Sequence, residues 1–127
     1  MSAGVETRKK NKDLENTLKK AVLRFLESSR VFCWRNNTGA IISQYKGKSR
    51  FFKFGAVGSG DVFALHRGIF VSIELKAPGK HPTFDQEAWM ERVRHHGGAA
   101  SWFDNLQDFI CWWDLTFPPG GGTNVLQ

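Results

Sequence analysis

The chain contains little of what marks several common classes of protein. It has two cysteines, Cys33 and Cys111, and neither lies in a CxxC pair, so neither a zinc site nor a disulfide is expected. Aromatic neighbours flank both of them, and we expect buried free thiols. The four histidines, at positions 66, 81, 95 and 96, have no metal-ligand spacing such as HxxxH, so we assign them no catalytic role.

Long apolar segments and internal repeats are missing as well. No apolar stretch approaches the roughly 20 residues that span a bilayer. Residues 1–12 are polar and charged and lack the apolar centre of a secretory signal. We therefore expect a cytoplasmic protein without a membrane partner. A length of 127 residues suits one domain, which we place at 1–117, with the proline- and glycine-rich segment 118–127 as a flexible tail.

Acidic residues are in deficit, because 12 acids face 18 lysines and arginines and leave a net charge of +6. Such a charge favours a polyanionic partner, since lysines and arginines that neutralise phosphates release counterions. Charge alone does not separate DNA from RNA or from an acidic membrane surface.

What the chain does have is a strongly apolar segment that ends in charge. Residues 69–76 are rich in β-branched and apolar side chains and predict a strand. Because successive side chains in a strand alternate between faces, one face is apolar throughout. Phe70, Ser72, Glu74 and Lys76 share the other face.

A second strand is predicted over 61–66, with Arg67-Gly68 as a tight turn between the two strands. If the loop is those two residues, His66 pairs with Ile69 and Asp61 lies directly opposite Glu74. A three-residue loop would shift this register. Carboxylates placed opposite each other, roughly 5 Å apart, repel, and a bound divalent cation would remove that repulsion.

The two acids, with the backbone carbonyl of Leu75, are oxygen ligands of the kind that Mg²⁺ or Mn²⁺ accepts. The alternative is that Glu74 and Lys76 lie on an ordinary solvated strand face and that Asp61 is a turn residue. Each of these residues alone fits this alternative, but the three together fit it less well. Charges at the end of an apolar strand are costly unless they are paired or metal-bound.

The rest of the chain predicts helices alternating with short strands, and hence an α/β fold with a mixed sheet flanked by helices. The expected elements are a helix over 13–28, strands over 31–35 and 40–45, a basic connection over 46–50, a glycine-punctuated approach over 51–60, a helix over 83–96, a strand over 99–103, and a last helix that Asp104 caps.

At these residues the chain resembles the PD-(D/E)XK nuclease superfamily, and more closely its virus-type replication and repair nuclease branch (VRR-NUC). The resemblance rests on Glu15 and on the segments 34–39, 54–61, 73–76 and 83–86, the last leading to Gly97-Gly98. One departure is Gly60, where the superfamily's name implies proline. The resemblance implies an αβββαβ core in which the strand from Ala99 runs parallel to the Glu74 strand.

The resemblance also implies roles for single residues. Asp61 and Glu74 would hold the metal, and Lys76 would lie beside the attacking water and the scissile phosphate. Glu15, on the first helix, would present a further acid to the site, although an exposed helix of this charge density carries several acids. Gln86 matches the family's glutamine after the lysine, but it also stands three residues after Thr83, where a capping box would use it.

The expected activity is metal-dependent hydrolysis of DNA phosphodiester bonds by an endonuclease without an organic cofactor. Small members of the branch resemble Holliday-junction resolvases, so we expect a homodimer that cuts branched DNA in repair or recombination, in a bacterial or phage-infected cell. A flap, nicking or restriction-type endonuclease stays open, as does a non-catalytic nucleic-acid-binding module. Basic residues in or beside loops near the predicted hairpin are candidates for phosphate contacts: Arg35, Lys46, Lys48, Arg50, Lys53 and Lys80.

Overall fold

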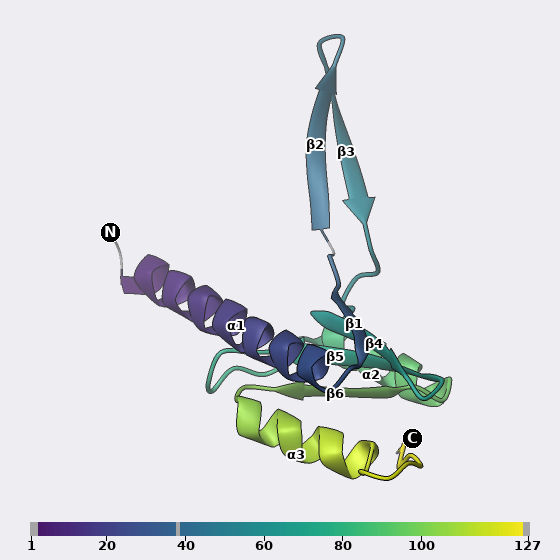
Figure 1. Cartoon of the computed structure of the whole chain (residues 1–127). Helices are drawn as coiled ribbons and strands as arrows, with labels where there is room; N and C mark the ends of the chain where they lie inside the picture. The colour runs from purple at the N-terminus through teal and green to yellow at the C-terminus, as the bar shows by residue number, and fades with distance from the viewer. Residues whose placement is uncertain (1–2, 38, 126–127) are drawn as a thin grey trace.

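A computed structural model describes residues 3–37 and 39–125. Within these residues, three helices and six strands follow one another (Figure 1). They are α1 (Ala3–Ser28), β1 (Phe32–Arg35), β2 (Gly39–Tyr45), β3 (Lys48–Phe54), β4 (Val62–His66), β5 (Ile69–Leu75), α2 (Phe84–His95), β6 (Ala99–Phe103) and α3 (Leu106–Thr116). Within the described ranges, no helix combines the length and the apolar composition that crossing a membrane requires.

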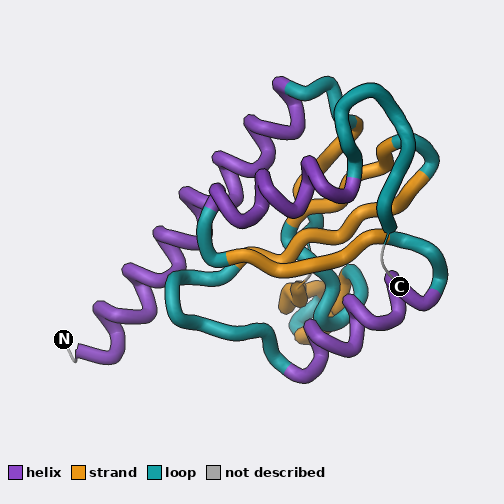
Figure 2. Tube along the Cα trace, turned by 90° about the horizontal axis from the view of Figure 1, so that it is seen from below, coloured by secondary structure: helices purple, strands orange, loops and turns teal. Residues whose placement is uncertain are grey.

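Four strands form a mixed sheet in the order β1-β4-β5-β6. Neighbouring strands are antiparallel except for β5 and β6, which are parallel and joined through α2. Helices α1 and α3 cover one face of the sheet and α2 covers the other, so the strands lie between two helical layers (Figure 2). The predicted α/β class, with a mixed sheet flanked by helices, is confirmed.

The two faces of β5 are both buried. Val71, Ile73 and Leu75 pack against α1 and α3 in the main core, as their alternation predicted. Ser72 and Glu74, on the opposite face, are 1% and 5% exposed, because α2 lies over them. A solvated face at Glu74 is therefore wrong.

The turn between β4 and β5 is the predicted one. His66 pairs with Ile69, and Arg67 and Gly68 take left-handed φ values of +52° and +79°. Two consecutive residues with positive φ match the twist of antiparallel strands in a two-residue loop.

Several elements differ from the sequence prediction. The first helix begins at residue 3, ten residues earlier than predicted, because its polar start carries no apolar periodicity although nothing in it opposes a helix. The segment 46–50 is not a loop: Lys46 and Gly47 form a tight turn, and β3 follows at once. Asn105, not Asp104, caps α3 by accepting a hydrogen bond from the Asp108 amide.

The cysteines differ from prediction too. Cys111 is exposed and Cys33 is half-buried, so neither is a fully buried thiol. Both are free, as expected. Burial and the charge of Glu27 raise the pKa of the Cys33 thiol.

The segment after α3 returns to the body of the molecule. The Arg67 guanidinium donates to the carbonyls of Pro118 and Gly122, at 3.1 and 2.7 Å. The Asn124 amide donates to the Thr116 carbonyl at 2.7 Å, and Val125 packs against the main core.

Candidate active site

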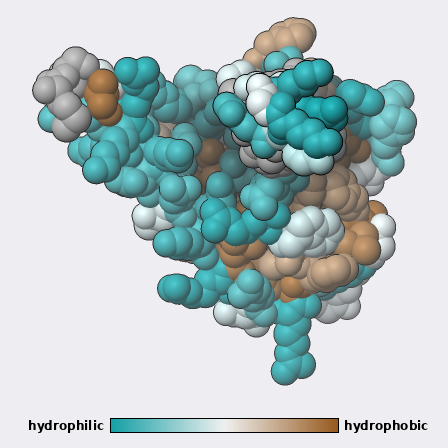
Figure 3. Space-filling model, turned by 90° about the horizontal axis from the view of Figure 1, so that it is seen from above, coloured by the Kyte–Doolittle hydropathy of each residue, from teal (hydrophilic) through white to brown (hydrophobic). Residues whose placement is uncertain are grey.

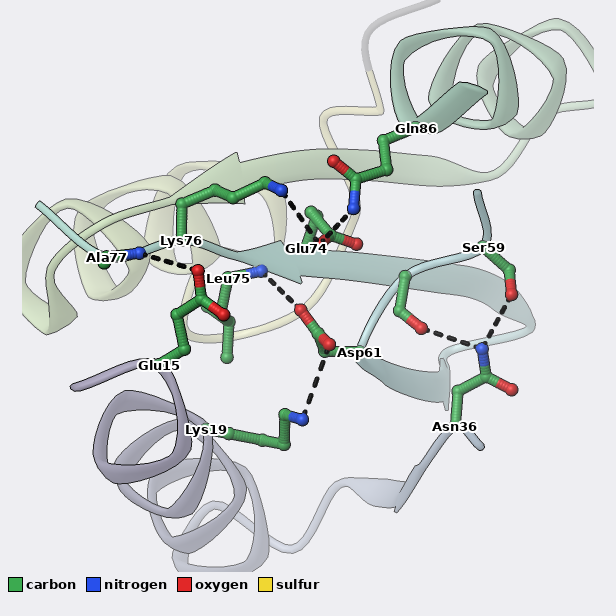
Figure 4. Close-up of polar contacts among 11 residues, drawn as sticks. Glu15, Lys19, Asn36, Ser59, Asp61, Glu74, Leu75, Lys76, Ala77 and Gln86 are labelled. Carbon is green, nitrogen blue, oxygen red and sulfur yellow. Dashed lines mark hydrogen bonds and ion pairs between the residues drawn. The ribbon is translucent and has the colours of Figure 1, made fainter. Parts of the chain in front are cut away.

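Asp61 and Glu74 meet at one end of the β4–β5 pair (Figure 4). The Asp61 amide donates to the Ile73 carbonyl at 2.8 Å, and Asp61 Oδ2 accepts from the Leu75 amide at 2.8 Å. The paired residues end at Val62↔Ile73, so a direct pairing of Asp61 with Glu74 is not part of the ladder. The two bonds instead hold Asp61 beside residues 73–75, at the end of β5.

The surroundings of Glu74 disfavour its charged form. Burial, the negative charge of Asp61, a hydrogen bond between the two carboxyl groups and the charge of Glu15 all raise its pKa, and only the Lys76 ammonium lowers it. The outcome is a pKa of about 9. A cation placed between the two acids would oppose every one of these electrostatic effects.

Each of the two acids has a lysine beside it. Lys76 Nζ lies 4.0 Å from Glu74 Oε1, as the Glu-x-Lys spacing on one strand face predicted. Lys19 Nζ lies 3.4 Å from Asp61 Oδ1. Lys19 was not predicted as a site residue, although a signal was present in the sequence: it stands four residues after Glu15 and so shares that residue's helix face.

Glu15 reaches the site from α1. Its Oε1 accepts a hydrogen bond from the Ala77 amide at 3.1 Å, directly beyond Lys76 at the end of β5. The structure therefore brings the predicted helix acid to the same end of the sheet as Asp61 and Glu74.

Gln86 joins the site to the first turn of α2. Its Oε1 accepts from the Thr83 amide at 2.8 Å, and its own amide donates to Thr83 Oγ1 at 3.3 Å, which completes a capping box. Its Nε2 donates to Glu74 Oε1 at 2.9 Å. The predicted capping box is confirmed, and the same side chain also reaches Glu74, because the cap holds the amide oxygen and leaves the NH₂ group facing Glu74.

The loop before Asp61 is fixed by Asn36. The Asn36 Nδ2 group donates to Ser59 Oγ and to the Gly60 carbonyl, both at 2.8 Å, and the Asn36 amide donates to the Asp61 carbonyl at 2.9 Å. Asn36 therefore ties the end of β1 to the Asp61 loop.

Gly60 is required by close packing. A Cβ atom there would lie 2.5 Å from Ser72 Oγ and 2.8 Å from the Ile73 carbonyl oxygen. Proline is therefore not tolerated before Asp61 in this chain, since any side chain at position 60 would clash with the backbone of β5.

The donor set fits a hard divalent cation, because carboxylate oxygens of Asp61 and Glu74 converge next to the acid of Glu15. Across the described ranges, no three His, Cys, Asp or Glu side chains form a ready metal-binding group, so an ion here would complete its shell with backbone oxygen or water. The part of Leu75 that bonds to the site is its amide, and a ligand role for its carbonyl stays a prediction.

The candidate phosphate-binding residues whose side chains the structure describes lie in different parts of the fold. Arg35 is exposed at the end of β1, and Lys80 is exposed in the loop after β5. Lys46, Lys48 and Arg50 are exposed together on the β2–β3 hairpin. Lys53 lies in β3, but its side chain is outside the part of the chain that the structure describes.

Comparison of the sequence with models of protein families gave no match, and comparison with curated proteins gave none either.

Proposed function

We propose that the chain is a metal-dependent endonuclease that hydrolyses DNA phosphodiester bonds, with Mg²⁺ or Mn²⁺ at Asp61 and Glu74. The observation that carries the proposal is the close acid pair, in which Glu74 is buried and Asp61 half-buried, with Lys76 Nζ 4.0 Å from Glu74 Oε1 and a pKa of about 9 for Glu74. The contacts with Lys19, Lys76 and Gln86 still leave the charged form of Glu74 disfavoured, and a bound cation would favour that form.

The order of the elements supports the same proposal. Without the β2–β3 hairpin, the chain from α1 to β6 reads α1, β1, β4, β5, α2, β6, which is the αβββαβ order that the resemblance to PD-(D/E)XK nucleases implies. The acid pair and Lys76 then fall at the positions that the same resemblance gives to metal ligands and catalytic lysine.

The roles of the chain's own residues follow from their contacts. A bound ion would polarise the phosphate and lower the pKa of a water molecule. Lys76 would orient that water and offset charge on the phosphate oxygens. Gln86 positions the Glu74 carboxyl through its 2.9 Å hydrogen bond, and Glu15 adds a third acid at the end of β5.

Branched DNA is the proposed substrate, and a homodimer is the proposed assembly, because two symmetric sites can cut opposed strands of a four-way junction. Strand β1 lies at the edge of the sheet with Phe32 and Trp34 exposed, and it offers a surface for contact between copies.

The decisive test measures cleavage of labelled four-way junctions, flaps and linear duplexes with Mg²⁺ present or replaced by EDTA. We expect Mg²⁺-dependent paired cuts in the junction, and we expect Asp61→Ala or Lys76→Ala to lower the rate by at least roughly 100-fold. Glu91→Ala, which removes an exposed acid on α2 that pairs with Arg94, serves as the control and should keep wild-type activity.

The outcomes separate the alternatives. Cleavage that survives both active-site substitutions would mean that the catalytic centre lies elsewhere. Equal cutting of linear duplex would contradict junction selectivity, and binding without any cleavage of DNA would favour a binding module.

A further inference from the structure

The β2–β3 hairpin stands away from the rest of the molecule. Seven residues on each strand pair from Gly39↔Phe54 to Tyr45↔Lys48 around the Lys46-Gly47 turn. Figure 1 shows the two strands rising from the α/β body as a separate arm, and Figure 3, viewed down that arm, shows mainly hydrophilic surface where it points at the viewer. At about 3.3 Å per residue, such a ribbon is roughly 20 Å long.

The segment that forms the arm has a net charge of +4, against +6 for the whole chain. Residues 36–60 contain three lysines and one arginine and no acid. Lys46, Lys48 and Arg50 are exposed at the tip, with Lys46 Nζ 5.4 Å from the ring centroid of Tyr45. Because Lys48 and Arg50 are two residues apart on one strand, they lie on the same face of the ribbon. This charge fits a polyanion and opposes contact with the same arm of a second copy.

The physical form of the arm also points to a partner. A two-stranded hairpin without a supporting layer has little stability of its own in water. The major groove of B-form DNA, about 12 Å wide, admits a two-stranded β-ribbon, whereas the major groove of duplex RNA is too narrow.

The base of the arm lies next to the acid pair. Strand β2 begins three residues after Asn36, and β3 ends seven residues before Asp61. The bonds from Asn36 to Ser59, Gly60 and Asp61 join the two stems at that point. A duplex held along the arm would therefore lead directly to Asp61.

We propose that the β2–β3 hairpin is a duplex-binding arm that lies in the major groove of the DNA beside the bond that is cut. This inference rests on the proposed function, since it places the arm relative to the proposed cleavage site. Lys48 and Arg50 contact phosphates across the groove, and the Lys46-Gly47 turn enters the groove first.

The test measures affinity of the full chain for a 30-bp DNA duplex in EDTA, so that binding is read separately from cleavage. The variant is K46N/K48Q/R50Q, in which asparagine suits the positive φ of +50° at position 46 and preserves the turn. We expect affinity at 0.1 M salt to fall at least ~10-fold and the slope of log Kd against log salt to fall by about 2 to 3. The matched control is K9Q/K10Q/K12Q, which removes the same charge from the exposed start of α1 and should weaken binding by less than ~3-fold.

Two further readouts locate the arm. Methylation of guanine N7, which lies in the major groove, should weaken binding of the wild type to the duplex and not binding of the hairpin variant. Duplex RNA of the same sequence should bind at least ~10-fold more weakly than DNA to the wild type.

The proposal is wrong if the hairpin variant and its control lose affinity equally, if N7 methylation has no effect, or if duplex RNA binds as well as DNA. It is also wrong if sedimentation shows that the variant changes oligomeric state while its affinity for DNA is kept. Loss of binding in the variant together with no Mg²⁺-dependent cleavage by the wild type would support the arm and reject the nuclease.

Discussion

At the scale of single residues, burial of Glu74 determines how the ion-free protein should respond to pH. Its pKa is raised from about 4.5 to about 9, so between these values the folded chain holds a proton that the unfolded chain releases. The stability that this proton supplies is complete below about pH 4.5 and is lost as pH rises toward 9. The limiting slope is about 1.4 kcal/mol per pH unit.

Glu74→Gln should remove this dependence, because an amide imitates the protonated acid and still accepts the hydrogen bond from Gln86. In EDTA we expect the variant to have a higher free energy of unfolding than the wild type at pH 8 and a similar one near pH 4.5. Urea unfolding at several pH values measures this. If the free energies of unfolding of the two proteins changed in parallel with pH, Glu74 would be ionised in the folded chain.

Single residues also show how far sequence reasoning could go at the site. Asp61, Glu74 and Lys76 could be placed together because a two-residue turn fixes strand register and a strand fixes which side chains share a face. The contact between Lys19 and Asp61 could not be predicted in the same way, since it depends on the angle at which α1 crosses the end of the sheet.

At the scale of elements, the Gln86 side chain bonds both to the first turn of α2 and to the Glu74 carboxyl. Thr83→Ala should remove only the cap hydroxyl and lower the free energy of unfolding by about 1 kcal/mol. The bond from the Thr83 amide to Gln86 Oε1 remains, so cleavage should stay within about 2-fold of the wild-type rate.

Gln86→Glu should instead lower the cleavage rate and leave stability nearly unchanged. A glutamate keeps the acceptor for the Thr83 amide, but it replaces the donor toward Glu74 with a second carboxylate oxygen. We expect little change in the helix cap and a fall in cleavage rate of roughly 10- to 100-fold. Unfolding and cleavage measured on the same preparations separate the two effects, and equal inactivation by Thr83→Ala would mean that Gln86 acts through the cap alone.

The elements differ in how visible they were in the sequence. Arg67-Gly68 was recognised as a turn because apolar runs flank it on both sides. Lys46-Gly47 forms the same kind of turn, but the basic residues around it suggested a loop. The strand before this turn was predicted over 40–45, but β3 was missed, because the basic residues 46–50 and the glycines after Phe54 indicated connections.

At the scale of the whole molecule, the segment after α3 contributes to stability at the end of β4 that lies far from Asp61. Deleting residues 118–127 removes the Arg67 bonds to Pro118 and Gly122, the Asn124 bond and the packing of Val125. We expect a loss of about 1 to 2 kcal/mol in free energy of unfolding and unchanged cleavage of a DNA junction. Thermal unfolding and a cleavage assay measure both, and loss of cleavage at a temperature where the deleted chain is folded would contradict this division.

The overall architecture could be predicted from the sequence because helix and strand periodicities alternate along most of the chain. This alternation indicated a mixed sheet between helices. The second buried face of β5 was harder to foresee. Ser72 and Glu74 look polar in the sequence, and only the packing of α2 over them shows that both lie inside.

The anchoring of the arm has a mechanical consequence. In the proposed complex with DNA, a ribbon roughly 20 Å long, whose stems are bonded together at Gly60 and Asp61, would act as a lever with its pivot beside the Asp61 carboxylate. A duplex whose path tilted the ribbon would tilt the peptide that carries Asp61 as well. The angle between two duplex segments of a DNA junction would thereby change the position of the Asp61 carboxylate. The chain could then distinguish DNA shapes without contacting a base.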